Sequence, residues 1–326
     1  MALKNLLKMK LKQRKQVKRL IWGIVAVFVL MNVIAALHAW KFTHFLNTDA
    51  QSVRPEELSF AQKFGTIVFG IENPRPENKN LPTQAFEIIT LKGNKSIEAW
   101  SIKAENSKGT VVIFHGYKGE KSSMLDISDE FLKLGFSTML VDFRGSGRSD
   151  GNQTTIGFHE ANDVKACFDF LKNKGEENIV LFGTSMGAVA VMKAINDFGL
   201  QPTGIILECP FGTMYKTTCA RFKAMGVPTF PMASLLMFWG GIENGFWAFS
   251  HNPISYAKGI ECPVLLLYGE KDARVSKMEI DAILENLNGE KSFKTYPLAG
   301  HENYLLKYKD QWVNDVVNFT SVLTNK

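Results

Sequence analysis

The pattern of hydrophobic and polar residues divides the chain into an apolar segment near the N-terminus and a body in which short apolar runs alternate with amphipathic stretches. The body pattern begins near Ala85. Its first two strand-like runs, AFEIITL and SIEAWSIKA, meet at Gly93-Asn94 and predict a β-hairpin. Five later runs are continuous and apolar: TVVIFHG, STMLVDFRG, NIVLFG, TGIILE and CPVLLLYG. Helical patterns near 122–135, near 158–173 and from about 186 lie among them. This alternation predicts an α/β fold with a mostly parallel sheet covered by helices on both faces.

The distinctive polar motifs of the body all follow predicted strands. They are His115-Gly116, Asp142 to Gly147, Ser185 and Asp272. Ligands of open parallel sheets bind at the carboxyl ends of the strands, so these four motifs predict one functional edge.

The segment Leu20–Leu37 has eighteen residues and no charge, and Asn32 is its only strongly polar residue. At about 1.5 Å per residue it nearly crosses a bilayer core of roughly 30 Å. Trp22 and Trp40 lie near its ends, as interfacial aromatics do, and residues 1–19 carry eight Lys or Arg and no acid. The segment therefore predicts a single-pass transmembrane helix over 20–40 with a cytoplasmic N-terminus and an extracytoplasmic body. A cleaved signal peptide is the main alternative, and a buried core helix fits less well.

These assignments divide the chain into a basic cytoplasmic tail (1–19), a transmembrane signal anchor (20–40), a membrane-proximal connector (41–84) and an α/β domain (85–326). The formal charge of +6 belongs to the tail, because the rest of the chain has 30 basic and 32 acidic residues. The body has no stripe of basic residues that would suggest a nucleic-acid partner.

The four cysteines show no C-x-x-C spacing, so the sequence predicts neither a zinc site nor a thioredoxin-type site. Outside the cytoplasm, Cys209 and Cys219 could form a disulfide.

The strongest chemical motif is G-T-S-M-G, Gly183 to Gly187, which follows the strand NIVLFG and precedes a helical pattern. Strand, G-x-S-x-G and helix form the context of a nucleophile elbow, which predicts that Ser185 is a nucleophile. The two glycines leave space for the neighbouring strand and helix. The alternative is an inert tight turn.

A serine nucleophile needs a base and an acid that orients the base. Of the six histidines, His301 follows the last predicted strand and precedes the final helix, and Asp272 follows the strand VLLLYG. The chain order serine, acid, histidine fits this fold. Glu270 is the rival acid, whereas Asp142 and Asp150 are interpreted as residues that shape a loop.

The backbone N–H groups of Tyr117 and Met186 are the predicted oxyanion-hole donors. Met186 begins the helix after the serine, and Tyr117 follows His115-Gly116. We expect His115 to shape that loop by hydrogen bonding.

The motifs FHGYKG, DFRGSGRSDG, GTSMGA, YGEKD and AGHENY, taken together, resemble those of the α/β-hydrolase superfamily, in particular its serine-aminopeptidase-like and membrane-anchored acyl-hydrolase branches. The resemblance covers residues from about 85 to 322. It implies an eight-stranded, mostly parallel sheet and a catalytic triad of Ser185, Asp272 and His301. It implies no particular substrate, because these branches cleave esters, thioesters and amides.

A cap insertion at about 211–258 is rich in Met, Phe and Trp, which suits an acyl pocket or a membrane-facing lid, although such residues also pack a cap onto a core. The sequence thus predicts a membrane-anchored serine hydrolase for ester or thioester bonds of a small or lipid-like acyl substrate. This chemistry needs no metal and no cofactor. An aminopeptidase-like serine peptidase is the second hypothesis, and a non-catalytic binding protein on the same fold is the third. Glu208, Glu243 and Glu302 are the candidate carboxylates for the α-ammonium group of a peptide substrate.

Overall fold

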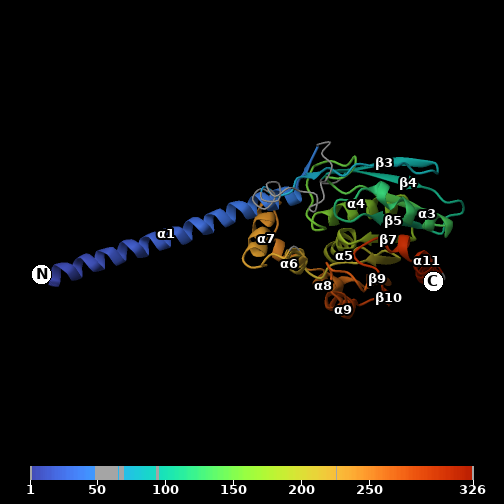
Figure 1. Cartoon of the computed structure of the whole chain (residues 1–326). Helices are drawn as coiled ribbons and strands as arrows, with labels where there is room; N and C mark the ends of the chain where they lie inside the picture. The colour runs from blue at the N-terminus through green and yellow to red at the C-terminus, as the bar shows by residue number, and fades with distance from the viewer. Residues whose placement is uncertain (1, 48–64, 66–69, 93–94, 225, 325–326) are drawn as a thin grey trace.

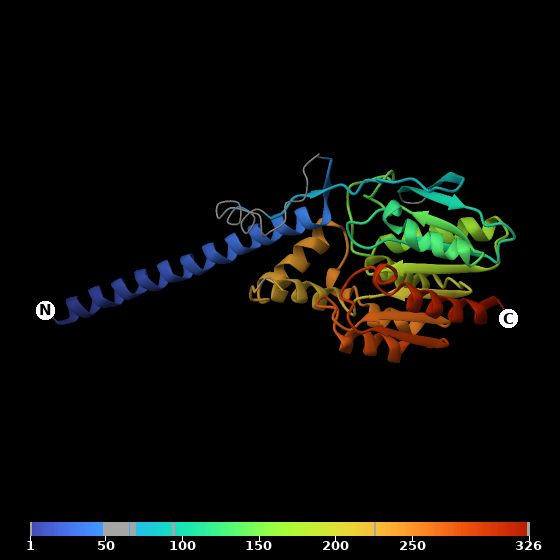
Figure 2. The same cartoon turned by 45° about the vertical axis from the view of Figure 1, so that its right-hand side comes forward.

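A computed structural model describes residues 2–47, 65, 70–92, 95–224 and 226–324. A long helix, α1 (Ala2–Thr43), leads into an α/β body, and the N-terminus lies far from that body in two views (Figures 1 and 2). A cap made from the middle of the chain lies beside the body-proximal part of α1 (Figure 2).

The body is built on an eight-stranded sheet in the order β10-β9-β8-β7-β5-β6-β4-β3. Its strands are β3 (Phe86–Lys92), β4 (Ser96–Ile102), β5 (Thr110–Phe114), β6 (Ser137–Val141), β7 (Ile179–Thr184), β8 (Gly204–Glu208), β9 (Val264–Gly269) and β10 (Lys291–Tyr296). The six neighbouring strands β10, β9, β8, β7, β5 and β6 pair in parallel. Strand β4 pairs antiparallel with both β6 and β3. The predicted mostly parallel sheet is therefore confirmed. The turn between β3 and β4, at Gly93-Asn94, lies outside the described residues.

The continuous apolar runs form central strands that are buried on both faces. Along β5, Val112 and Phe114 join one core cluster, and Val111 and Ile113 join the other. The helices α4 (Glu160–Asn173), α5 (Met186–Phe198) and α9 (Lys277–Asn286) contribute to the first cluster, and α3 (Leu125–Lys133) and α11 (Lys309–Thr324) to the second. Burial of alternate side chains on opposite faces explains why these runs show no polar alternation.

Short helices complete the body and the cap. They are η2 (Lys121–Met124), α6 (Met214–Ala224), α7 (Met232–Glu243), η3 (Ala248–Ser250), α8 (Pro253–Tyr256), η4 (Ala257–Gly259) and α10 (Tyr304–Lys307). The predicted helix near 122–135 thus begins with a 3-10 turn. The cap consists mainly of α6 and α7, which lie between β8 and β9 in the chain, where the sequence predicted an insertion.

The helix α1 is, within the described residues, the one helix long and apolar enough to cross a membrane. Its C-terminal end is fixed to the body. Strand β1 (Phe45–Leu46) pairs in parallel with β2 (Asn73–Pro74), and His44 forms a β-bridge to Gln153. Of the predicted connector, 41–84, residues 48–64 and 66–69 lie outside the described residues.

Candidate active site

Ser185 lies at the sharp turn between β7 and α5, in a backbone conformation that side chains rarely adopt, with φ 53° and ψ −109°. The flanking glycines explain how this turn fits. A Cβ at Gly187 would lie 2.4 Å from Phe114 O in β5, and one at Gly183 would lie 2.5 Å from Ala188 N in α5. Both distances are too short for a side chain, so the interpretation of G-x-S-x-G as a close-packed elbow is confirmed.

The three predicted triad residues form one hydrogen-bonded chain. His301 Nε2 is 2.9 Å from Ser185 Oγ, and His301 Nδ1 is 2.7 Å from Asp272 Oδ2. The second oxygen of Asp272 accepts hydrogen bonds from Arg274 N at 2.7 Å and Val275 N at 3.0 Å. The Asp272 side chain is fully buried, whereas Ser185 and His301 are partly exposed. A base thus lies between a reachable hydroxyl and a buried, fixed carboxylate.

The loop that carries His301 is anchored to the strand that precedes Asp272. The backbone N–H of Gly269, which is the last residue of β9, donates a hydrogen bond of 2.8 Å to Tyr304 Oη. Asn303 Nδ2 also donates to Asp126 Oδ2 at 2.7 Å. These contacts fix the position of the His301 loop relative to Asp272, and no sequence motif predicted either of them.

Comparison with known proteins bears on the fold that carries these residues. Residues 105–238 match the family model of serine aminopeptidases. A solved esterase of Pyrococcus furiosus, Pf2001, superimposes with a TM-score of 0.64 at 22% sequence identity, over 76% of this chain and 96% of that chain. The chain has the α/β-hydrolase fold. Two sequence relatives of this chain are the uncharacterized protein YqkD of Bacillus subtilis (27% identical; 64% of this chain, 69% of the relative) and the uncharacterized membrane protein YNL320W of Saccharomyces cerevisiae (26% identical; 71% of this chain, 78% of the relative).

The predicted oxyanion donors flank Ser185. Met186 is the first residue of α5, where a backbone N–H has no partner within its own helix. On the other side, a Cβ at Gly116 would lie 3.7 Å from Ser185 Cβ, so the segment that leads to Tyr117 passes beside the serine. Two N–H groups in these places can face an oxygen that develops negative charge at a carbonyl attacked by Ser185.

The side chain of Tyr117 connects the same loop to α1. Tyr117 Oη donates a hydrogen bond of 2.7 Å to Phe42 O, and the Tyr117 ring stacks on the Phe42 ring with 4.7 Å between centroids. Asn73 Nδ2 donates to Tyr117 Oη at 3.3 Å. The end of the N-terminal helix is therefore in direct contact with the predicted oxyanion loop.

His115 shapes this loop, as expected. The ring is fully buried; its Nε2 accepts a hydrogen bond from Phe143 N at 3.2 Å, so its Nδ1 donates to Gly116 O at 2.8 Å. Burial lowers the pKa of His115 and keeps the ring neutral.

The two acids interpreted as loop residues also organise backbone. Asp142 accepts hydrogen bonds from Lys121 N at 2.8 Å and Arg148 N at 3.1 Å, and it pairs with the buried Lys121 side chain. Asp150 accepts one from Ser96 N at 3.2 Å.

The electrostatics of His301 favour its protonated form. Burial of the ring opposes its charge, but Cys209 and Asp272 outweigh burial and raise the pKa of His301. Ionised Asp272 stabilises the imidazolium that forms when His301 accepts a proton. Glu270, the rival acid, is exposed and is not the carboxylate bonded to His301.

The four cysteines are free, so the possible Cys209–Cys219 disulfide is absent from the structure. Cys209 is instead a buried neighbour of His301, with the unusual φ of 40°. Ligand atoms of Cys209, Asp272 and His301 lie within 4.8 Å of one another. Both ring nitrogens of His301 already take part in hydrogen bonds, to Asp272 and Ser185, so an ion held there would break the chain to the serine.

The three candidate carboxylates for a substrate amine differ in availability. Glu208 is fully buried and accepts from Trp312 Nε1 at 2.7 Å and Thr184 Oγ1 at 3.1 Å. Glu302 is exposed and bonds to Gly300 N and Lys307. Glu243 ends α7, and one of its oxygens is buried without a hydrogen-bond partner among the described residues.

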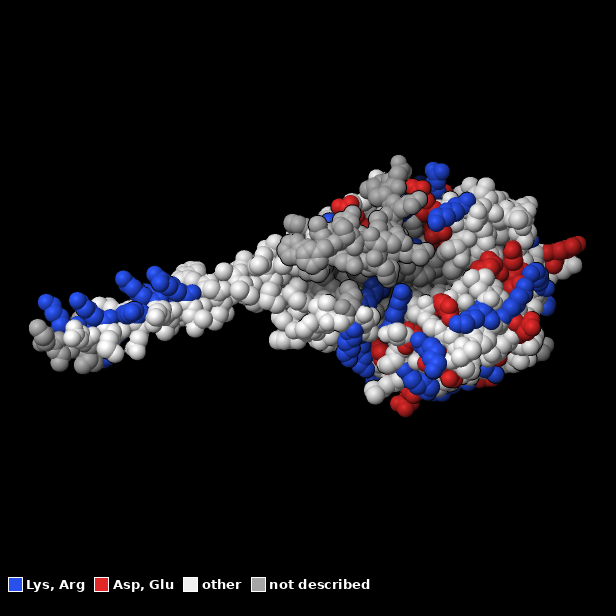
Figure 3. Space-filling model, in the orientation of Figure 1, with Lys and Arg blue, Asp and Glu red and all other residues white. Residues whose placement is uncertain are grey.

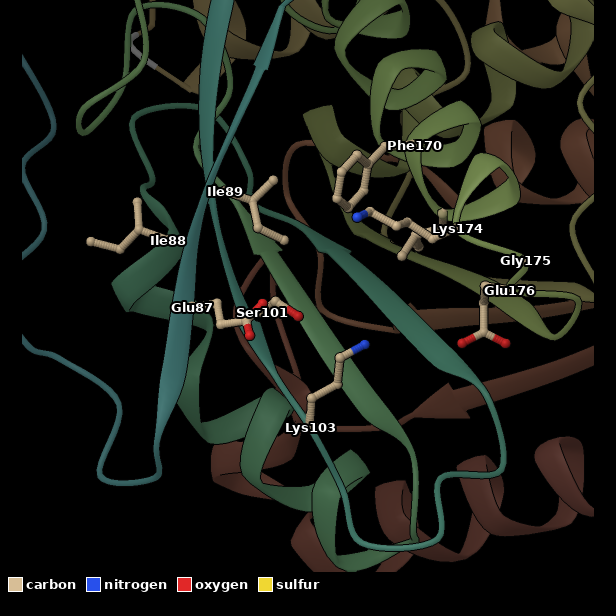
Figure 4. A pocket seen from close by; sticks show the side chains of 10 residues that line it. Glu87, Ile88, Ile89, Ser101, Lys103, Phe170, Lys174, Gly175 and Glu176 are labelled. Carbon is tan, nitrogen blue, oxygen red and sulfur yellow. The ribbon is translucent and has the colours of Figure 1, made fainter.

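An open hollow of about 610 Å³ lies elsewhere, at the antiparallel end of the sheet (Figure 4). Side chains of β3, β4 and the end of α4 line it, including Ile89 and Phe170. It contains none of the three triad residues, so it is not the site of the chemistry that they support.

Proposed function

We propose that this α/β hydrolase is a membrane-anchored serine hydrolase that cleaves an acyl ester or thioester. The observation that carries the proposal is the hydrogen-bonded chain from Ser185 Oγ through His301 to Asp272. Such a chain activates a hydroxyl that is otherwise a weak nucleophile. The esterase likeness of the fold supports an acyl substrate.

The reaction begins when His301 Nε2 accepts the proton of Ser185 Oγ while Oγ bonds to the substrate carbonyl carbon. The carbonyl oxygen becomes an oxyanion that the N–H groups of Tyr117 and Met186 stabilise. When the tetrahedral intermediate collapses, the bond to the alcohol or thiol breaks, and His301 donates its proton to that leaving group.

The acyl group then remains bonded to Ser185. Water attacks its carbonyl carbon, and His301 accepts a proton from that water. Collapse releases the carboxylic acid and returns the proton to Ser185 Oγ. Throughout both halves, Asp272 holds the His301 ring in one orientation and stabilises its cation.

Replacement of the nucleophile tests the chemistry. We expect Ser185→Ala to lose hydrolysis of a short p-nitrophenyl ester and to keep the circular dichroism spectrum of the parent. Ester turnover at the parent rate by the folded variant would rule out Ser185 as the nucleophile.

A serine peptidase is the second candidate, because the matching family model is that of serine aminopeptidases. The buried and occupied oxygens of Glu208 argue against it as an amine anchor. Apart from Glu243, cap residues 226–250 carry no carboxylate, and an ammonium left unpaired among them is costly, which makes the ester hydrolase the first choice.

The membrane part of the proposal assigns residues 20–40 to the bilayer, the basic tail to the cytoplasm and the hydrolase body to the other side. The apolar and mostly exposed surface of α1 supports it. Protease added to intact cells or spheroplasts should degrade the body and spare residues 1–19. Cleavage of the tail with a protected body would reverse the orientation, and a mature chain that starts near residue 40 would replace the anchor by a cleaved signal.

A further inference from the structure

The cap helix α7 packs along α1 rather than only on the hydrolase body. Trp239 Nε1 donates a hydrogen bond of 3.1 Å to Asn32 Oδ1. One and two turns of α1 later in the direction of the body, Ala35 and Ala39 are buried, and a Cβ at Gly240 would lie 3.8 Å from Ala39 Cβ. Small residues thus let the two helices approach closely along one stripe.

The cap carries large apolar side chains that are exposed. Phe238 is 38% exposed, Ile242 54% and Trp247 57%. Val227, Phe230 and Phe249 are exposed on the same cap. Between Gly226 and Ser250 the sequence has one charged residue, Glu243. The cap beside α1 accordingly shows a largely uncharged surface (Figure 3). A cluster of exposed large side chains on this scale marks an interaction surface.

The position of Asn32 in α1, where Trp239 contacts it, indicates what covers the exposed apolar surface of the cap. Asn32 lies five residues inside Leu37, the end of the uncharged run, which is about 8 Å along the helix axis. Any bilayer that α1 spans therefore extends past the point where Trp239 touches α1. Because α7 lies beside α1 at this depth, its outer side must face lipid as well.

The catalytic residues lie close to the same boundary. The oxyanion loop is bonded to Phe42 O through Tyr117, and Phe42 is ten residues, or about 15 Å, from Asn32 along α1. The cap is thus on the membrane side of the Ser185 region.

We propose that the lipid bilayer is the partner of the cap, with α7 and the aromatic-rich segment 246–249 after it embedded in the leaflet next to the body. Access to Ser185 is then from the membrane, and the substrate class is a membrane-resident acyl ester. The proposal rests on the membrane-anchored hydrolase proposed above.

Depth measurement tests the position of the cap directly. Single nitroxide labels are placed on the full chain in vesicles of phosphatidylcholine and phosphatidylglycerol, with Phe238→Cys and Ile242→Cys as test sites. Val27→Cys, in α1, is the control for insertion of the anchor. Val322→Cys, on α11 at the far side of the body, is the control for water. Cys219→Ser and Cys262→Ser remove the two native thiols that are not buried.

We expect labels at 238 and 242 to collide readily with oxygen and to be protected from a water-soluble nickel complex, as the label at 27 is. The label at 322 should show the opposite. Labels at 238 and 242 that behave like the label at 322, while the label at 27 lies in hydrocarbon, would overturn the proposal. A label at 27 that is exposed to water would show that α1 does not anchor the chain in the bilayer, and this result would also overturn the proposal.

A kinetic measurement separates this proposal from the proposed chemistry. The double variant Phe238→Asp, Ile242→Asp should lose about tenfold or more in kcat/KM for a long-chain ester carried in the vesicles, since charges in a bilayer are unfavourable. It should keep the parent rate on a water-soluble short ester, and Val322→Asp should keep both rates. Equal rates of the double variant and the parent on vesicle substrate would contradict the proposal. Failure of the parent chain on both esters would instead reject the hydrolase function, and the label depths would still decide where the cap lies.

Discussion

Substitution of Tyr117 by Phe tests whether the end of α1 helps to position the oxyanion hole. The change removes only the hydroxyl group and keeps the ring that stacks on Phe42. It deletes the 2.7 Å hydrogen bond to Phe42 O and the weaker contact from Asn73 Nδ2. The loop that carries the Tyr117 N–H then loses its polar connection to α1.

The size of the effect follows from the lost hydrogen bond. A buried carbonyl left unsatisfied costs about 1–3 kcal/mol, and the bond to Phe42 O is part-buried, which favours the lower part of that range. If the full cost falls on the transition state, kcat drops by about 5- to 150-fold, because about 1.4 kcal/mol corresponds to a factor of ten. Loss of a whole oxyanion donor costs about 100- to 1,000-fold. We therefore expect a decrease of about tenfold for Tyr117→Phe, since the donor N–H remains in the chain.

The assay is kcat on a short p-nitrophenyl ester with the full chain in detergent, together with thermal unfolding. Tyr256→Phe is the matched control, because its hydroxyl donates to the buried His251 Nδ1 at 3.0 Å and bonds to neither the triad residues nor the oxyanion loop. Both variants should lose stability, and only Tyr117→Phe should lose kcat. Unchanged kcat in Tyr117→Phe, with a stability loss like that of Tyr256→Phe, would show that the contact is purely structural.

Three further results are expected. First, His301 must be neutral to accept a proton, so kcat/KM should fall as pH decreases through its raised pKa; the acidic limb of the profile should lie above 6.5, the ordinary value. Asp272→Asn should move that limb down and reduce kcat by about 10⁴-fold, and a limb that does not move would contradict the role of Asp272. Second, Gly187→Ala should sharply lower the melting temperature, because the new Cβ would lie 2.4 Å from Phe114 O; a parent-like melting temperature would refute the close packing of the elbow. Third, p-nitrophenyl acyl esters should be better substrates than aminoacyl p-nitroanilides. Good anilide turnover that Glu208→Gln, Glu243→Gln or Glu302→Gln selectively removes would favour the peptidase.

The sequence was sufficient for the parts of the molecule that local patterns control. Continuous apolar runs predicted the central strands because both faces of those strands are buried, as in β5. The elbow was predictable because only glycine fits at positions 183 and 187. Ser185, Asp272 and His301 could be grouped because each follows a parallel strand, and such strands end at one edge of the sheet.

Contacts between distant segments were not predictable in this way. Tyr117 was expected to contribute only its N–H group, yet its side chain bonds to Phe42, 75 residues away. Trp239 and Asn32 are 207 residues apart and meet only because α7 folds back onto α1. Cys209 looked like a disulfide candidate, although the tight backbone after β8 places it beside His301. In each case the partner depends on how whole elements pack, which no local period encodes.

The most direct test of whether Ser185 is the activated nucleophile is to locate a covalent adduct. The full chain is treated with a fluorophosphonate, digested, and sequenced by tandem mass spectrometry. If His301 and Asp272 activate Ser185, the phosphonyl group should be found on Ser185, on the peptide that contains GTSMGA, and Ser185→Ala should not be labelled. An adduct on another residue, or no adduct on a folded chain, would contradict the role of Ser185 as the nucleophile.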